Sequence, residues 1–171
     1  SMPEFEFYCE NLAIEAVKHD FFEQCPAEKY EMGVNTPHIV FNYLDYLLWK
    51  NEWIDDRDFK FEFRNSVEHW YPQHPSEGTF DSWENGVNRF GNLCIIQRNV
   101  NSKFSNLAPE AKKSTFHNMI SKGSLKLQIM SNLTVKKGNV NASKNWKDDL
   151  CSSHEEDMLS LLKTACGIEI K

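Results

Sequence analysis

The clearest chemical potential in the chain lies where a carboxylate precedes a histidine. Glu68 and His69 are followed by Pro72, and a second polar cluster occupies residues 91–103. Histidine suits the role of general base because its ordinary pKa lies near neutrality. Carboxylate and amide oxygens are the ligands that Mg²⁺ prefers. A base beside a divalent cation can hydrolyse a phosphodiester bond, so we expect the two segments to fold together into one metal-dependent nuclease site.

Each candidate residue also has an ordinary structural explanation. A carboxylate next to a histidine is often only a hydrogen-bonded pair, Asn92 could be a turn residue, and Asn101 could cap a helix. A zinc site that uses His74 and Cys94 is disfavoured, because no set of four ligands has suitable spacing. The catalytic interpretation therefore depends on the two segments occurring together and in this order.

Two short strands and a helix would have to position this site. Residues 59–64 alternate aromatic and charged side chains, which predicts a half-buried strand that leads into residues 67–69. Residues 93–96 predict a short apolar strand, and a tight turn at Gly91 would let the two strands pair antiparallel. Residues 99–106 predict a turn into a short helix.

The alternation within the first strand has two consequences. Its aromatic side chains, Phe59, Phe61 and Phe63, are expected in the core and not on a surface that stacks bases. Successive residues of a strand face opposite sides. Glu68 and His69 can therefore serve one site only if the backbone bends where the strand ends.

Helical spacing of apolar residues predicts that most of the remaining chain is α-helical. Ser124 is expected to cap one helix, and Ser152 with Glu155 to form a capping box for the last one, which Gly167 would end. The predicted fold class is α+β, mostly helical, with a small two-stranded antiparallel core. A loop is expected over residues 134–145, and helices over residues 6–19, 37–51, 108–121, 125–132 and 152–167.

The two polar segments resemble a known family. The first, Glu68-His69-Trp70-Tyr71-Pro72-Gln73, is similar to the (Asp/Glu)-His-x-x-Pro-Gln signature of HNH nucleases, the His-Me finger or ββα-metal class. The second combines Gly91-Asn92-Leu93 with Asn101-Ser102-Lys103-Phe104-Ser105-Asn106, and it is similar to the C-terminal HNH domain of GmrSD-type restriction proteins. The resemblance extends over about residues 38–162, including the helical stretch from Phe41 to Lys50.

The resemblance implies roles for four residues. His69 would be the general base, and Glu68 would bind the divalent metal, Mg²⁺ or another cation such as Mn²⁺. Asn101 would be the second protein ligand, directly or through water. Asn92 would stiffen the loop that orients His69. The core would be a ββα-metal unit.

The resemblance also implies a function and partners. The domain would be a DNA endonuclease that restricts foreign or modified DNA, in a full-length protein that carries an upstream nucleotide-hydrolysing domain. We expect residues 1–57 to be a helical segment that links to that domain and residues 58–171 to be the HNH domain. A catalytically inactive DNA-binding or regulatory module and an RNA endonuclease are the alternatives.

The charge distribution bears on nucleic-acid binding. The net charge is −6, but residues 89–147 carry eleven Lys or Arg and one Asp or Glu, whereas residues 1–58 carry four and thirteen. A basic segment could contact a phosphate backbone, or it could pair with the acidic ends of the chain. Charge and proximity favour phosphate contacts from Arg98 and Lys103. Lys112 and Lys113 are expected either to contact phosphates or to lie on a solvated helix face.

The remaining composition excludes several classes of protein. The five cysteines include no C-x-x-C pair, which favours free thiols in a reducing cytoplasm over a disulfide framework. No apolar run is long enough to span a membrane, and no signal segment is present. The opening Ser1-Met2 leads us to expect that this sequence is a fragment of a longer protein. His117 and His154 are expected to be surface or packing histidines, with a contribution to the cleft as the alternative.

Overall fold

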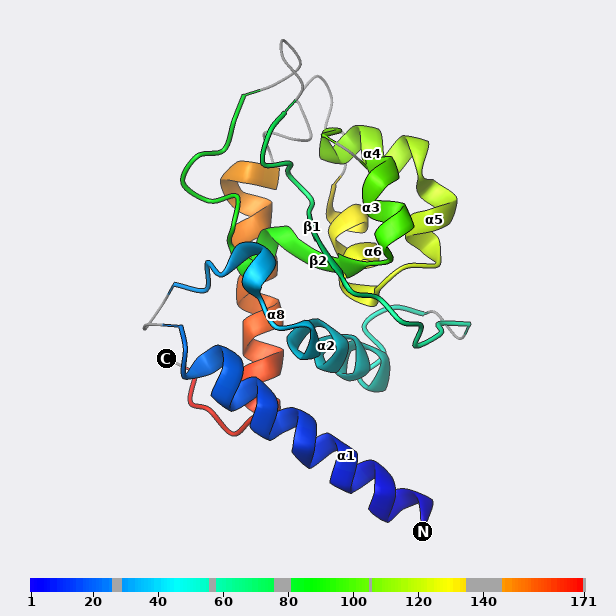
Figure 1. Cartoon of the computed structure of the whole chain (residues 1–171), viewed down its shortest axis with the longest axis vertical. Helices are drawn as coiled ribbons and strands as arrows, with labels where there is room; N and C mark the ends of the chain where they lie inside the picture. Colours follow the sequence, from blue (N-terminus) through cyan, green and yellow to red (C-terminus); the bar gives the residue numbers. More distant parts are fainter. Residues whose placement is uncertain (26–28, 56–57, 76–80, 105, 135–145, 171) are drawn as a thin grey trace.

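The two predicted strands pair antiparallel near the centre of the molecule in the computed structural model (Figure 1). Strand β1 is Ser66–His69 and strand β2 is Leu93–Ile96, with Ser66 opposite Ile96 and His69 opposite Leu93. Helix α3 (Arg98–Phe104) follows β2 directly. Helices surround this unit, so the predicted fold class, α+β and mostly helical with a two-stranded antiparallel sheet, is confirmed.

The structure describes residues 1–25, 29–55, 58–75, 81–104, 106–134 and 146–170. Most of the loop predicted for residues 134–145 therefore lies outside the described residues. Gly167, at φ +68, ends the last helix as expected.

The remaining elements are α1 (Met2–Val17), a π-helical turn (Lys18–Phe22), a 3-10 turn (Gly33–Asn35), α2 (His38–Lys50), a 3-10 turn (Phe90–Asn92), α4 (Pro109–Thr115), α5 (His117–Ser121), α6 (Leu125–Leu133), a π-helical turn (Trp146–Leu150) and α8 (Cys151–Ala165).

Strand β2 is apolar along its whole length because both of its faces are buried. Leu93 and Ile95 point into one hydrophobic cluster, while Cys94 and Ile96 point into a second. This division follows from the two-residue period of a strand. The sheet therefore separates two cores, and β2 lies between them.

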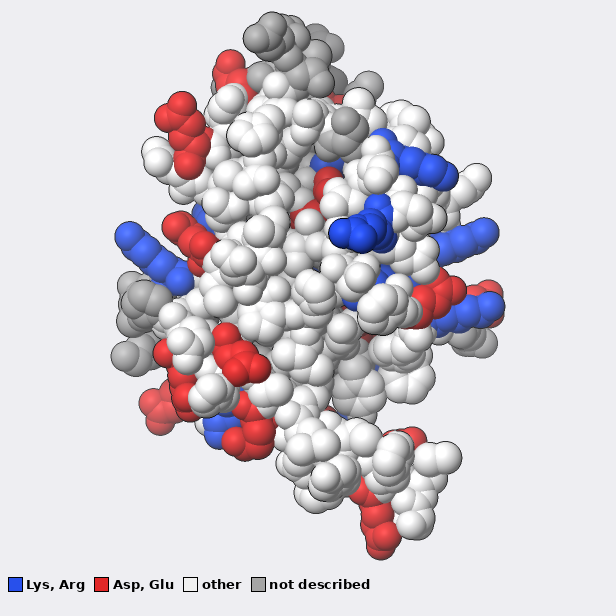
Figure 2. Space-filling view, viewed as in Figure 1, with Lys and Arg blue, Asp and Glu red and all other residues white. Residues whose placement is uncertain are grey.

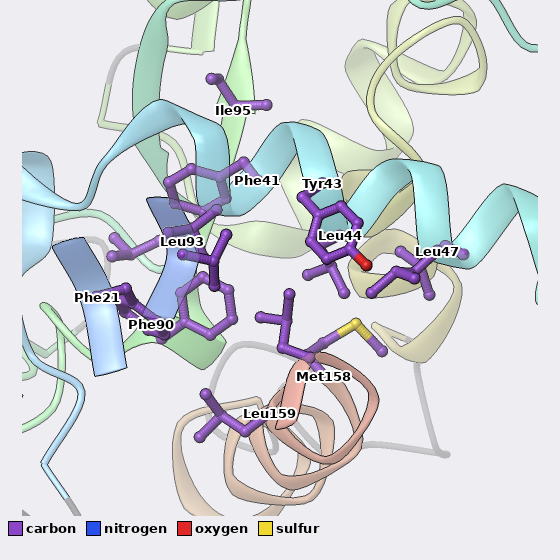
Figure 3. Packing of buried hydrophobic residues seen from close by; sticks show 14 of the residues in the cluster. Phe21, Phe41, Tyr43, Leu44, Leu47, Phe90, Leu93, Ile95, Met158 and Leu159 are labelled. Atoms are coloured by element: carbon purple, nitrogen blue, oxygen red, sulfur yellow. The ribbon is translucent and has the colours of Figure 1, made fainter. Parts of the chain in front are cut away.

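The first core joins the sheet to α2, α8 and the end of α1. Figure 3 shows side chains of α2, among them Phe41 and Leu44, packed with Phe90, Leu93 and Met158. Val17 and Phe21 contribute from the N-terminal segment. This core continues across the boundary that the sequence analysis placed between residues 57 and 58. The second core lies between the sheet and α3 to α6, and its largest fully buried side chains are Trp70, Trp146 and Phe104.

A buried polar network connects α2, α6 and the turn before β2. The carboxylate of Asp45 accepts from the hydroxyl of Ser124 and the backbone N–H of Lys126, each at 3.1 Å, so it caps α6 from another helix. The ammonium of Lys126 donates to the backbone carbonyls of Phe90, at 3.1 Å, and Leu93. Burial raises the pKa of Asp45 to about 6 and lowers that of Lys126 to about 8. Ser124 also caps α6 as predicted, since its hydroxyl accepts from Leu127 N.

The predicted strand over residues 59–64 is wrong, since residues 59–65 are irregular. Strand β2 offers no partner there, because pairing ends at Ser66 and Ile96 and the chain then turns into α3. Phe61 and Phe63 are consequently exposed, at 56% and 81%, and only Phe59 of the three packs against the core.

Two helix predictions also need correction. The helix expected over residues 108–121 is divided at Phe116 into α4 and α5. The last helix begins with the π-helical turn before α8, so Ser152 and Glu155 lie inside it and make no capping box. Both side chains instead accept from Arg89, at 3.0 and 2.9 Å, and Glu155 also accepts from Gly91 N at 2.8 Å. They tie α8 to the turn before β2. No helix in the described part of the chain is long and apolar enough to cross a membrane.

Candidate active site

The end of β1 lines a cavity of about 200 Å³. Glu68, His69 and Asn101 all contribute to its wall, together with His74 from the segment after β1. Three consecutive residues of β1 take part, which places the cavity along the edge of β1 that β2 leaves open. The structure therefore brings together the three residues to which the sequence analysis assigned the roles of base and metal ligands, although neighbouring strand residues face opposite sides.

A hydrogen bond orients the imidazole of His69. Its Nε2 lies 2.9 Å from the amide oxygen of Asn88. Because an amide oxygen can only accept, Nε2 carries the proton in neutral His69 and Nδ1 keeps the lone pair. The Asn88 backbone carbonyl accepts from Gly33 N at 3.2 Å. Gly33 has φ +56, and a Cβ there would lie 2.7 Å from the Asn88 amide oxygen. A glycine is therefore required beside the residue that orients His69.

The surroundings of His69 keep it neutral. Burial lowers the pKa of its imidazole, and the proximity of Lys112 and His74 lowers it further, while the bond to Asn88 opposes this shift. His69 is only 7% exposed. A neutral imidazole whose Nδ1 lone pair is available can accept a proton at neutral pH.

Lys112 is buried beneath the site, although the sequence analysis expected it on the surface. Its ammonium donates to the carboxylate of Glu68 at 2.8 Å and to the backbone carbonyls of His69 and Trp70 at 2.7 and 2.9 Å. The side chain has no exposed surface, so it can neither contact a phosphate nor lie on a solvated helix face. Burial raises the pKa of Glu68, and the nearby ammonium opposes that shift. Lys112 thus fixes the backbone where β1 ends.

The side chain of Asn92 extends the pairing of the sheet by one residue. Its oxygen accepts from Tyr71 N at 2.8 Å, and its nitrogen donates to Tyr71 O at 3.0 Å, as an opposing strand residue would. The same oxygen accepts from the indole N–H of Trp146 at 2.9 Å, and the nitrogen also donates to Val87 O at 2.8 Å. Both acceptor positions of the Asn92 oxygen and both N–H groups of its nitrogen are therefore used. Asn92 therefore holds the chain just beyond His69 and does not itself line the cavity, which is compatible with the stiffening role that the resemblance implied.

Asn101 reaches the cavity from α3. Its amide nitrogen donates to the hydroxyl of Ser66 at 2.6 Å. The amide oxygen of Asn101 takes no part in this hydrogen bond. The described residues contain no group of three or more His, Cys, Asp or Glu that could hold a metal. Besides the imidazoles of His69 and His74, the residues that line this cavity offer one carboxylate, that of Glu68, and the side-chain amides of Gln73, Asn101 and Asn106. Hard oxygen donors with a single carboxylate fit Mg²⁺, which keeps several waters and substrate oxygens among its ligands.

The cationic residues predicted to contact phosphates differ in their exposure and in the helix face that they occupy. Arg98 and Lys103 are exposed on α3. Arg98 lies three residues before Asn101 and so shares its helix face, whereas Lys103, two residues after it, does not. Lys113 is half-buried and donates to the backbone carbonyls of Ser131 and Thr134 at 2.8 and 2.9 Å, so it closes the end of α6. Figure 2 shows Lys and Arg side chains gathered on the side formed by α3 to α5.

Three further residues complete the comparison with the sequence analysis. Asn88 was missed, because no spacing pattern links it to His69. His117 is exposed on α5. His154 is buried in α8, where its ring centroid lies 5.8 Å from that of Trp146 and its Nε2 has no hydrogen-bond partner within the described chain. Both histidines therefore fit the expected surface and packing roles.

A comparison with known families agrees with the motifs. The model of the family described as GmrSD restriction endonucleases, C-terminal domain, matches residues 18–161. The match covers most of the chain and crosses the boundary expected at residue 57. No curated protein and no solved structure gives a significant match. The chain belongs to the family of C-terminal domains of GmrSD restriction endonucleases, as the residues around Glu68 and Asn101 predicted.

Proposed function

We propose that this domain is an HNH-type DNA endonuclease that depends on a divalent cation. One observation carries the proposal. Glu68, His69 and Asn101 line a single cavity, and His69 is held there with its Nε2 on Asn88. Membership in a restriction endonuclease family supports nuclease activity. The site adds a base and oxygen donors of the kind that phosphodiester hydrolysis needs.

The residues of the site would divide the reaction between them. Nδ1 of His69 accepts a proton from a water molecule as the water oxygen attacks phosphorus, and Asn88 steadies the imidazolium that forms. The bond from phosphorus to the 3′ oxygen breaks, and that oxygen takes a proton from solvent, leaving a 5′-phosphate and a 3′-hydroxyl. Glu68 and Asn101 would hold Mg²⁺ or Mn²⁺, which supplies charge stabilisation at the phosphate and the leaving oxygen. Lys112 favours the ionised form of Glu68.

DNA is the proposed substrate, and restriction of foreign or modified DNA is the proposed role. The family description supports the role. Arg98 supports a contact with the phosphate backbone, because it is exposed on the face of α3 that also carries Asn101. Lys112 and Lys113 are engaged inside the fold. The basic field available to DNA is therefore smaller than the charge of residues 89–147 indicates.

A catalytically inactive DNA-binding module is the second candidate, and one contact favours it. The ammonium of Lys112 lies 2.8 Å from the carboxylate that would bind the metal, so it competes with a cation for that charge. The Glu68 oxygen outside this bond would have to serve as the ligand.

A direct test measures metal binding and cleavage on the same protein. Calorimetric titration with Mn²⁺ should show binding that Glu68→Gln weakens, and supercoiled plasmid should be nicked with Mg²⁺ or Mn²⁺ but not in excess chelator. Metal binding without cleavage of DNA or structured RNA would support the inactive module. Cleavage of RNA alone would reassign the substrate. Full cleavage in chelator would exclude the metal-dependent mechanism.

A further inference from the structure

Helix α1 carries an apolar stripe that the fold leaves exposed. All of α1 is described, and Val17 is its single buried residue. Phe5, Tyr8 and Leu12 are 63%, 61% and 54% exposed. They recur at intervals of three and four residues, so they lie along one side of the helix. Figure 1 shows that the first part of α1 projects away from the rest of the molecule.

A cavity adjoins this stripe between α1 and α2. It measures about 350 Å³, and its wall includes Cys9 and Ala13 from α1 and Ile39, Tyr46 and Trp49 from α2. Cys9 lies four residues after Phe5 and three before Leu12, so it neighbours both on the helix surface, and the stripe and the cavity form one continuous apolar surface. We call this surface, formed by Phe5, Tyr8, Cys9, Leu12, Ala13, Ile39, Tyr46 and Trp49, the α1 groove.

Acidic residues border the α1 groove on both sides. Helix α1 contains Glu4, Glu6, Glu10 and Glu15 and no Lys or Arg. Glu6 and Glu10 also line the cavity. On a helical projection, Glu4 and Glu15 flank the other side of the stripe. Figure 2 shows this end of the molecule as uncharged surface with acidic side chains at its margin. An apolar furrow between two acidic borders matches an apolar helix face between two basic borders.

We propose that the α1 groove binds a basic amphipathic helix of a partner protein. The helix would place aliphatic or aromatic side chains, spaced three and four residues apart, against the stripe and the cavity. Lys and Arg on either side would face the four glutamates. They would replace the ion pairs that Glu4, Glu10 and Glu15 make with the Ser1 ammonium, Lys50 and Lys18 at 3.1, 3.8 and 3.9 Å, since such solvent-exposed pairs are weak. This surface is separate from the cavity at Glu68 and His69, so the inference does not depend on the proposed nuclease activity.

Other occupants fit the surface less well. A second copy of α1 would bring four more glutamates against the same borders, and like charges opposite each other are unfavourable. The Lys- and Arg-rich side of a second copy would offer no hydrophobic side chains to fill the groove. Within the described residues, no large hydrophobic side chain of α3 to α6 is exposed. DNA and anionic membranes would be repelled by the acidic borders.

Cys9 makes the proposal testable. It is the exposed cysteine, whereas Cys25, Cys94, Cys151 and Cys166 are buried. A thiol reagent applied to the folded chain therefore reports on the groove. The probe is a synthetic helical peptide with leucines at positions 1, 4, 8 and 11 of its apolar face and lysines beside them, and its twin carries glutamate in place of every lysine.

The lysine peptide should bind roughly tenfold or more tightly than its glutamate twin, and it should slow the reaction of Cys9. Leu12→Ser and Glu6→Lys should weaken binding of the lysine peptide. Phe7→Ser is the matched control, since Phe7 is 69% exposed on another face of the same helix. Circular dichroism would verify that each variant keeps its helices.

Three outcomes would overturn the proposal. The peptides could bind equally or not at all, the control Phe7→Ser could weaken binding as much as Leu12→Ser, or Cys9 could react at an unchanged rate in the complex. Self-association in sedimentation experiments that Leu12→Ser abolishes would instead make a second copy the occupant.

Discussion

The Nε2 atom of His69 lies 2.9 Å from the amide oxygen of Asn88, nineteen residues further along the chain. This contact selects which imidazole nitrogen carries the proton and leaves Nδ1 to act as a base. Asn88 is held in turn by the 3-10 turn at Gly33. The orientation of the proposed base therefore depends on a segment outside both sequence motifs.

Replacing Asn88 should impair catalysis without removing the base. Asn88→Ala frees the imidazole to rotate and to change tautomer, so we expect kcat to fall roughly 10–100-fold, as for other residues that orient a histidine. Asn88→Asp places a carboxylate beside His69, which should raise the pKa of His69 and move the acidic limb of the pH–rate profile to higher pH. Asn85→Ala, an exposed asparagine of the same loop, is the control. An unchanged rate and pH profile for both Asn88 variants would contradict the orienting role.

Lys112 should matter for stability more than its position on a surface-like helix suggests. Lys112→Met leaves the buried carboxylate of Glu68 unpaired, so we expect the free energy of unfolding to fall by about 3–5 kcal/mol. The double variant Glu68→Gln with Lys112→Met removes both charges and should regain part of that loss. Urea denaturation followed by circular dichroism measures both. Equal losses in the single and double variants would argue against a stabilising ion pair.

The buried His154 should make the fold sensitive to acid. Burial, with a smaller effect of the Lys126 charge, holds the pKa of His154 well below its ordinary value. The unfolded chain therefore takes up the proton first, and stability that is complete above about pH 6.5 declines as pH falls, by at most about 1.4 kcal/mol per pH unit.

His154→Leu should reduce that decline when urea denaturation is compared at about pH 7.5 and about pH 5.5. Asp45 changes the free energy of unfolding in the opposite direction. Because its pKa in the folded protein is raised to about 6, the stability that it contributes is lost as pH rises. Asp45 is present in both proteins, so the difference between them isolates His154. Identical pH dependence would show that His154 is not held neutral.

The two exposed cations of α3 should contribute unequally to DNA binding. Arg98→Ala should weaken binding to all DNA sequences alike and reduce the slope of log K against log salt by about 1. Lys103→Ala, which changes a side chain on another face of the same helix, should have a smaller effect. Equal slopes for the wild type and Arg98→Ala would remove Arg98 from the interface.

The parts of the site that the sequence predicted are those marked by local spacing. Glu68, His69, Asn92 and Asn101 lie in two short motifs, and the strands that carry them follow from apolar runs beside turn residues. Asn88 has no such mark, because its approach to His69 depends on Gly33 packing beside it.

Tertiary packing overrode local pattern elsewhere. Residues 59–64 alternate as a strand should, but β2 ends before it could pair with them. Lys112 occupies a helix rich in charge, and only the packing of α4 over the end of β1 shows that its ammonium is buried with Glu68. Neither result follows from propensity or periodicity, because both depend on which element lies alongside.

The most direct test of the central claim compares plasmid nicking by the wild type and by His69→Ala, with His117→Ala as an exposed-histidine control. With Mg²⁺ or Mn²⁺ present, we expect the wild type and the control to nick supercoiled DNA at similar rates and His69→Ala to be roughly 10²–10⁴-fold slower. Nicking by His69→Ala at the wild-type rate would contradict the assignment of His69 as the base.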